Sequence, residues 1–423
     1  MRRALAGLSL IVAASLGAGC GPKDNRTVLH FWAMGSEGEI VGALIPEFER
    51  LHPEIHVEVE QLPWTAAHEK LLTAVAGDST PDLCQLGNSW IPEFVVLKAL
   101  APLQQRIDAS TTITRADYFS GIWDSNVVGG AIYGVPWYVD TRLLFYRSDL
   151  IAAAGFAAPP TSWGQWLEVL AAIKASSHGE RFGILLPLNE YDPLIALALQ
   201  QQQPMLRDNG TRGNFASKDF ERTFGFYVEM FRQHYAPSVR DSAISNVWTE
   251  FGRGYFAFYV SGPWNIGEFR RRLPASLDGK WMTAPLPGPD GPGASIAGGS
   301  SLAVFRGSKH ADAAWQLIEF LSQPAVQQRF HAMTGNLPAR RSAWAAAEIA
   351  ADPTTRAFRD QLERVQPRPK VAEWERIATE MQLMTERVVR GDLSVHEGAV
   401  ELDARTDAIL AKRRQLLAEG AVL

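Results

Sequence analysis

The chain has 423 residues, of which 46% are hydrophobic and 21% are charged, and its formal net charge is −5. This length and hydrophobic content are sufficient for two lobes with buried centres. The charge balance, without a long run of either sign, argues against a nucleic-acid-binding protein, for which a basic stripe is expected.

The first twenty residues have the layout of an export signal. Two arginines precede an uncharged, mostly apolar stretch that ends before Cys20. That stretch is shorter than the roughly 20 apolar residues that cross a bilayer, so we expect a cleaved signal over residues 1–19 rather than an anchor helix. The segment "LGAGC" resembles a bacterial lipobox, although Leu16 stands four rather than three residues before Cys20. Lipidation of Cys20, with residues 20–27 as a tether, would hold the exported protein on a membrane facing the periplasm or cell surface; the alternative is an ordinary signal with an incidental cysteine.

The next part of the chain predicts a β-α-β-α-β order. The apolar residues have the pattern of a strand over 27–35, 54–62 and 82–87. Over 38–53 and 65–78 they have the spacing of a helix. This order is typical of a largely parallel sheet with helices on its faces. Ligands of such sheets bind beyond the carboxyl ends of the strands, where this chain has turn-forming, polar residues at 35–39 and 87–90.

The remainder alternates strands and helices and then becomes helical. Residues 134–147 are β-rich, and Thr161 or Ser162 is the expected N-cap of a later helix. A Pro/Gly-rich loop over 284–295 precedes a strand over 301–308 and a helix over 310–324. From about residue 345 the pattern predicts helices almost throughout.

Catalytic and metal-binding motifs are absent from the sequence. It has no phosphate-binding P-loop, no G-x-S-x-G and no H-E-x-x-H. His52 and His56 stand four apart, but Pro53 interrupts the helix that they would need to share. Only Cys84 follows Cys20, so the mature chain has no intramolecular disulfide. We therefore expect no metal and no cofactor, while a pair of carboxylates for glycoside cleavage stays an open alternative because its geometry is spatial.

Six stretches in register resemble the extracellular solute-binding proteins of bacterial ABC importers, in particular the carbohydrate-binding group of maltose- and trehalose-binding proteins. They are "VAGDSTPDLCQLG", "YGVPWYVDTRLLFYRSDLIAAAGF", "SGPWNI", "APLPGP", "GGSSLAVFRGSKHADAAWQLIEFLSQPAVQQRF" and "GNLPAR". The resemblance implies an α/β fold of two hinge-linked lobes with a helical C-terminal segment. We expect an N-terminal lobe over 28–139 and 300–342 and a C-terminal lobe over 140–299 and 343–423.

The same resemblance implies a function without chemistry. A monomeric receptor would capture an oligosaccharide, with maltose, trehalose or a related α-glucoside as the first expectation, and deliver it to permease subunits driven by a separate ATPase. Nucleic acid is not an expected partner. The alternatives are a membrane-anchored glycosidase or polysaccharide lyase, a receptor for a phosphodiester or polyamine, and a lipoprotein that binds another protein through exposed tryptophans.

A sugar has apolar C–H faces and a rim of hydroxyls, so its pocket needs flat rings beside polar side chains. In the family a tryptophan at the position of Trp264 stacks on a sugar ring; the alternative is packing between the lobes. Near the ends of the early strands, the resemblance and the fold argument select Glu37, Glu39, Trp64, Asn88 and Trp90. Either glutamate could instead be a solvated acid at a helix start, and Trp90 could pack against its helix.

Two candidate crossings between the lobes add further residues. Tyr138, Asp140 and Arg142 alternate along a strand and so share a face, where sugar hydroxyls could bind them; a contact between Asp140 and Arg142 is the alternative. The second crossing comprises Gly298, Gly299 and Ser300, and its glycines allow either hinge motion or close backbone approach to a ligand.

The remaining candidates rest on rough correspondence with the family. They are Glu190, Tyr191, Arg340 and Trp374. The guanidinium of Arg340 could donate to two adjacent hydroxyls, with a surface position as the alternative, and Trp374 stands in a region comparable to that of another sugar-stacking tryptophan.

Overall fold

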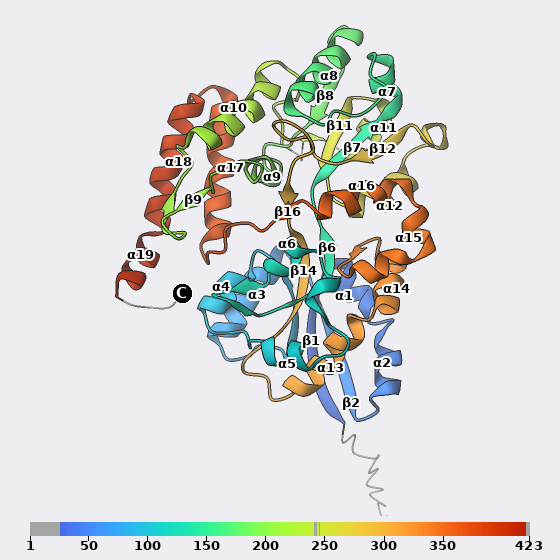
Figure 1. Ribbon diagram of the computed structural model, residues 1–423, viewed down its shortest axis with the longest axis vertical. Helices are drawn as coiled ribbons and strands as arrows, with labels where there is room; N and C mark the ends of the chain where they lie inside the picture. Colours follow the sequence, from blue (N-terminus) through green and yellow to red (C-terminus); the bar gives the residue numbers. More distant parts are fainter. Residues whose placement is uncertain (1–25, 241–242, 245, 420–423) are drawn as a thin grey trace, which may run out of the picture.

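The computed structural model describes residues 26–240, 243–244 and 246–419, which form two α/β lobes, one above the other in Figure 1. The predicted signal and Cys20 lie outside the described residues. No helix in this described part of the chain is long and apolar enough to cross a bilayer.

The first lobe, at the bottom of Figure 1, is built on a six-stranded sheet of order β15-β6-β14-β3-β1-β2. Its strands are β1 (Thr27–Met34), β2 (Ile55–Leu62), β3 (Leu83–Gly87), β6 (Val135–Asp140), β14 (Gly298–Val304) and β15 (Leu337–Pro338). β1 pairs in parallel with β2 and β3, as predicted, whereas β14 runs antiparallel to both β3 and β6. The complete sheet is therefore mixed.

Short helices cover this sheet. They are α1 (Gly35–Val41), α2 (Ile45–Leu51), α3 (Trp64–Ala76), α4 (Ile91–Val96), α5 (Gln104–Ala109), α6 (Ser120–Asp124), α13 (Ala311–Leu321) and α14 (Pro324–Thr334). The single helix predicted over residues 38–53 is in fact two, α1 and α2. Pro46 cannot donate a hydrogen bond within a continuing helix and is instead accommodated in the first turn of α2.

The second lobe contains a four-stranded sheet of order β12-β7-β11-β8. Its strands are β7 (Leu143–Arg147), β8 (Phe182–Leu185), β11 (Phe256–Ser261) and β12 (Trp281–Ala284).

The helices of the second lobe follow the same order along the chain. They are α7 (Ser148–Ala153), α8 (Trp163–Ser176), α9 (Asp192–Ala198), α10 (Lys218–Arg232), α11 (Val247–Arg253), α12 (Trp264–Arg272), α16 (Pro353–Leu362), α17 (Trp374–Arg390), α18 (Val395–Ile409) and α19 (Ala411–Ala418). Ser162 is the N-cap of α8, where its side chain accepts a hydrogen bond from the Gln165 amide. The predicted helical tail is confirmed.

Small elements complete the two lobes. They are α15 (Ala347–Ala351), β4 (Val127–Val128), β5 (Ala131–Ile132), β9 (Leu206–Arg207), β10 (Arg212–Gly213), β13 (Ser295–Ile296) and β16 (Val365–Gln366), with 3-10 turns η1 (Arg115–Asp117), η3 (Ala275–Leu277) and η4 (Arg341–Ala345). β13 and β16 pair in parallel, and β16 lies where the two lobes meet in Figure 1.

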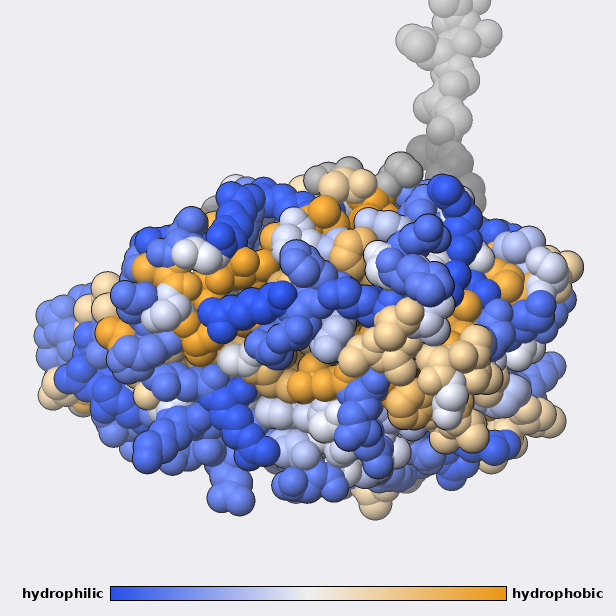
Figure 2. Space-filling model, turned by 90° about the horizontal axis from the view of Figure 1, so that it is seen from above, coloured by the Kyte–Doolittle hydropathy of each residue, from blue (hydrophilic) through white to orange (hydrophobic). Residues whose placement is uncertain are grey.

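Apolar side chains gather in separate clusters on the two faces of each sheet. One cluster is shared by the lobes and includes Phe31 and Trp137 from the first and Phe145 and Phe269 from the second. The opposite faces have clusters of their own. Viewed from above the second lobe, hydrophobic residues form patches within a largely hydrophilic surface (Figure 2).

The chain crosses between the lobes at the segments where the sequence suggested it. β6 ends at Asp140 in the first sheet, and β7 begins at Leu143 in the second. β13 leads directly into β14 through residue 297. The residue limits proposed for the two lobes stay a prediction.

Gly299 makes the second crossing possible. Its φ is +115°, and a Cβ at this position would lie 2.3 Å from the carbonyl oxygen of Tyr138. We expect Gly299→Ala to lower the free energy of unfolding by about 1–3 kcal/mol, because the side chain would strain the backbone and separate β14 from β6. Urea denaturation measures the change.

Gly225 provides the matched control. It lies in α10, and a Cβ there would meet nothing within 4 Å. Gly225→Ala is expected to leave stability unchanged or raise it by up to about 1 kcal/mol. Equal stability of the two variants would show that β14 does not need glycine at 299.

Candidate functional site

A cavity of about 540 Å³ lies between the lobes, where strands β1, β3 and β6 end. We call it the cleft. The structure places these sequence-predicted residues in its lining: Glu37, Trp64, Asn88, Trp90, Tyr138, Asp140, Arg142, Trp264, Gly298, Gly299 and Ser300. These residues, predicted from strand ends and from lobe crossings, thus line the same cavity.

The first lobe contributes two indole rings to the cleft. Trp64 begins α3 and Trp90 directly precedes α4, and their ring centroids lie 5.6 Å apart with planes inclined by 64°. Behind them, the His68 ring lies 5.0 Å from that of Trp90, and its Nε2 is 2.7 Å from Glu93 Oε2. The hydrogen bond that His68 donates to Glu93 raises the pKa of His68 above its ordinary value. The two indoles therefore meet edge to face as an apolar wall, with His68 packed against Trp90.

The second lobe contributes Trp264, the first residue of α12. Its side chain is 41% exposed, and the guanidinium carbon of Arg142 lies 4.7 Å from the ring centroid. The ring folds back over Gly262, where a Cβ would come within 1.9 Å of it. Gly262 is thus required for the orientation of this indole, which leaves part of the ring uncovered in the cleft.

The floor of the cleft is a buried polar network. The Gln85 amide nitrogen donates to the Tyr138 hydroxyl at 3.1 Å and to Ser300 Oγ at 3.2 Å, and Ser300 Oγ donates to the Tyr138 hydroxyl at 3.0 Å. Burial, reinforced by the nearby charge of Glu37, raises the pKa of Tyr138 well above its ordinary value. The phenol therefore stays protonated and presents a fixed hydroxyl to the cleft.

Glu37 and Asn88 are held by partners from distant parts of the chain. The Asn336 amide nitrogen donates to Glu37 Oε1 at 2.7 Å, and Ser301 Oγ donates to Asn88 Oδ1 at 3.1 Å. Within the described residues, the buried Nδ2 of Asn88 has no partner. A ligand with an acceptor oxygen would satisfy this donor.

Two arginines on the second-lobe side of the cleft share one buried carboxylate. Arg142 Nη2 lies 2.5 Å from Asp192 Oδ2, and Arg368 Nη2 lies 2.7 Å from Asp192 Oδ1. Burial on its own would raise the pKa of Asp192, but Arg368 and Arg142 hold it below its ordinary value. Arg142 also donates to Asp140 Oδ1 at 2.7 Å. The contact between Asp140 and Arg142, which the sequence left open as the alternative to sugar binding, is therefore present. Both cations are compensated.

Glu39, Glu190 and Tyr191 do not line the cleft. Glu39 is exposed on α1. Glu190 lines an adjoining cavity of about 500 Å³ that shares Trp264 with the cleft. The Tyr191 hydroxyl donates to Glu375 Oε2 at 3.1 Å. Of these three residues, only Glu190 therefore lines a cavity that shares a residue, Trp264, with the cleft.

Arg340 and Trp374 lie away from the cleft altogether. Arg340 is buried, and it donates to Asp117 Oδ2 at 2.6 Å and to the Ser322 carbonyl at 2.9 Å. Its guanidinium is therefore already hydrogen-bonded within the first lobe. Trp374 is 1% exposed inside the apolar cluster of the second lobe. These two positions do not support the ligand contacts expected for them.

The lining also includes residues that sequence reasoning missed, namely Ser36, Gly87, Ser89, Asn336 and Arg368. Ser36, Gly87 and Ser89 fall inside the strand-end segments that were singled out. Arg368 stands in "QPRPK", six residues before Trp374, and an arginine between two prolines is a signal that could have been followed. No group of three or more His, Cys, Asp or Glu among the described residues is arranged to hold a metal ion.

Comparison with known proteins places the chain in a family. Residues 43–357 match the model of the bacterial extracellular solute-binding proteins. The solved structure of the sugar-binding protein MalE from the phytopathogen Xanthomonas citri is 54% identical, with a TM-score of 0.91 over 93% of this chain and 99% of that one. The galactooligosaccharide-binding protein of Bacillus subtilis is 24% identical over 90% of this chain and 91% of its own length. The diacetylchitobiose-binding protein DasA of Streptomyces coelicolor is 24% identical over 76% of this chain and 77% of its own length.

The matches agree with the architecture built from the residues upward. The family model covers well over half of the chain, and the structural match extends through both lobes. The expected two-lobe periplasmic-binding-protein fold is therefore confirmed, and the chain belongs to the bacterial extracellular solute-binding proteins.

Proposed function

We propose that this protein is the receptor of an ABC importer and that it captures a neutral oligosaccharide in the cleft. The observation that carries the proposal is the meeting of three tryptophans from both lobes, Trp64, Trp90 and Trp264, over a buried polar floor. Such rings cover the C–H faces of a sugar, while the fixed hydroxyl and amide groups bind its rim. Lobe closure would then enclose the ligand.

Charge compensation favours a neutral solute over an ionic one. A phosphodiester would need basic groups free to pair with it, but Arg142 and Arg368 already share Asp192. A polyamine would need free carboxylates, but Glu37 and Asp140 already accept hydrogen bonds from Asn336 and Arg142.

The size of the available space supports a ligand of more than one sugar unit. The cleft and the adjoining cavity measure about 540 and 500 Å³, and Trp264 lines both. Maltose, trehalose or a related α-glucoside is our first expectation. The names of the relatives, sugar-binding MalE and the galactooligosaccharide-binding protein, support an oligosaccharide.

The enzyme alternative receives less support from the site. A glycosidase needs two carboxyl groups that flank the bond to be cleaved. Glu37 and Asp140 are instead held by partners within the protein. As a receptor, the chain would deliver its solute unchanged to a permease with a separate ATPase, and lipidated Cys20 would keep the monomer at the membrane surface.

Calorimetric titration of the lipid-free mature chain tests this proposal. The panel comprises maltose, trehalose, sucrose, maltotriose, cellobiose and xylobiose, with chromatography of each sugar afterwards. We expect at least one α-glucoside to bind with a Kd of about 1 μM, corresponding to roughly −8 kcal/mol, and to be recovered intact. Absence of binding across the panel would contradict the oligosaccharide assignment, and cleaved sugar would establish the enzyme alternative.

A further inference from the structure

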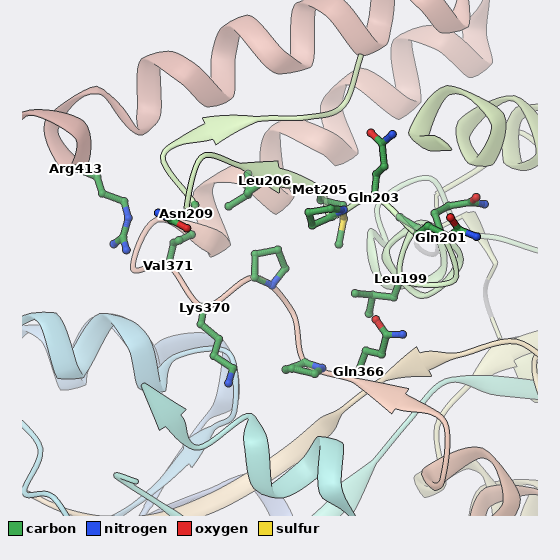
Figure 3. A pocket seen from close by; sticks show the side chains of 16 residues that line it. Leu199, Gln201, Gln203, Met205, Leu206, Asn209, Gln366, Lys370, Val371 and Arg413 are labelled. Carbon is green, nitrogen blue, oxygen red and sulfur yellow. The ribbon is translucent and has the colours of Figure 1, made fainter. Parts of the chain in front are cut away.

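A second cavity, of about 380 Å³, and the cleft share the segment of residues 366–371 as a wall. Figure 3 shows the residues that line this second cavity. It is bounded by this segment, by the chain between α9 and β9, and by the start of α19. The lining includes Pro367, Pro369 and Lys370, whereas Arg368 lines the cleft. We call this space the rear cavity, and its walls differ chemically from those of the cleft.

The rear cavity lacks the features that suit a sugar ring. No aromatic ring and no carboxylate occurs among the described residues that line it. Side-chain amides, such as those of Gln201 and Gln366, alternate with aliphatic walls formed by proline, leucine and methionine (Figure 3). An aliphatic ligand with one hydrogen-bonding end suits such walls better than a stacked sugar does.

A buried arginine is the strongest polar feature of the rear cavity. Arg413 is only 8% exposed, and its Nη1 stands 3.9 Å from Glu373 Oε2, too far for a hydrogen bond. In the described structure neither Arg413 Nε nor Gln201 Nε2 has a hydrogen-bond partner. Each buried donor left unsatisfied costs about 1–3 kcal/mol, so each favours an acceptor of its own. The two side chains lie on opposite sides of the cavity (Figure 3).

The second cation of the lining is already engaged. Lys370 Nζ donates to the carbonyl oxygens of Asp124 and Val127 in the first lobe, at 2.6 and 3.0 Å. Arg413 forms only a long ion pair, 3.9 Å from Glu373, and its Nε has no hydrogen-bond partner in the described structure. A carboxylate is the acceptor that matches a guanidinium most closely.

We propose that the rear cavity is a binding site for a small aliphatic carboxylate, separate from the solute cleft. The carboxylate pairs with the guanidinium of Arg413, and the aliphatic body extends along Pro367 and Pro369. The volume lies within the range typical of small-molecule sites. This site does not depend on the identity of the solute in the cleft.

Titration of the mature chain with hexanoate, and with hexanamide as its uncharged analogue, tests the proposal. We expect hexanoate to bind with a Kd of about 1 mM or tighter and hexanamide to bind at least about tenfold more weakly, because only the former pairs with Arg413. Calorimetry and ligand-observed NMR provide the readouts. If hexanoate does not bind to the unaltered chain, or if hexanamide binds equally well, the rear cavity is not a carboxylate site.

Substitutions then locate the site. Arg413→Gln is expected to weaken hexanoate binding at least about tenfold, whereas Lys412→Gln, an exposed position on the same helix, is expected to leave it unchanged. Trp264→Ala in the cleft should not affect it. Equal hexanoate affinity in Arg413→Gln and the unaltered chain would refute the rear cavity as the site, and thermal unfolding of both variants verifies that they are folded.

Discussion

Trp264→Ala is expected to weaken oligosaccharide binding about 30- to 150-fold, or by about 2–3 kcal/mol. The indole supplies a large apolar area that is already oriented in the unliganded protein. Its position over Gly262 and beside Arg142 limits the conformations that binding would otherwise have to restrict. The loss in the variant therefore includes buried area and preorganisation together.

The same substitution should change stability little, because the ring is 41% exposed. Calorimetric titration measures the affinity, and thermal unfolding verifies the fold. Trp32→Ala is the matched control: Trp32 is a partly buried tryptophan of β1 that lies under the Lys70 ammonium, 4.5 Å from it, and it does not line the cleft. Equal sugar affinity in the two variants would contradict stacking on Trp264.

Much of the cleft could be predicted because its residues are fixed by local chain geometry. Glu37, Asn88 and Trp90 follow the ends of strands β1 and β3, and parallel strands bring such ends to one edge of a sheet. Tyr138 and Asp140 end β6, the strand that leads into the second lobe. Hydrophobic periodicity was enough to locate these strands, and thus the cleft edge.

The missed residues depend on contacts that periodicity does not encode. Asn336 reaches the cleft through its bond to Glu37, which is distant in sequence. Arg368 is placed by Asp192, at the start of α9. Similarly, a helix over residues 38–53 had the right apolar spacing, but Pro46 divides it. Arg340 has the side chain expected of a sugar contact, yet Asp117 binds it elsewhere.

Asp192→Asn is expected to lower the free energy of unfolding by about 3–5 kcal/mol, because it breaks a buried ionic group and leaves both cations in place. The side chains of Asp192, Arg142 and Arg368 are only 12%, 17% and 15% exposed. The amide can donate and accept hydrogen bonds, but it does not compensate two guanidiniums. Ligand affinity should fall as well, because Arg142 also lies against Trp264.

The pH dependence of this loss follows from the lowered pKa of Asp192 in the folded protein. Its stabilising contribution is complete above the unfolded pKa, about 3.9, and disappears as pH falls through the lower folded value. Urea denaturation should therefore show a constant difference between the variant and the unaltered chain near neutral pH, and a smaller one below about pH 4.

Asp208→Asn is the control, since that carboxylate is 58% exposed and paired with the half-exposed Arg207. Its effect on the free energy of unfolding should stay within about 1 kcal/mol. Similar losses in both variants would mean that the shared carboxylate does not hold the two arginines together.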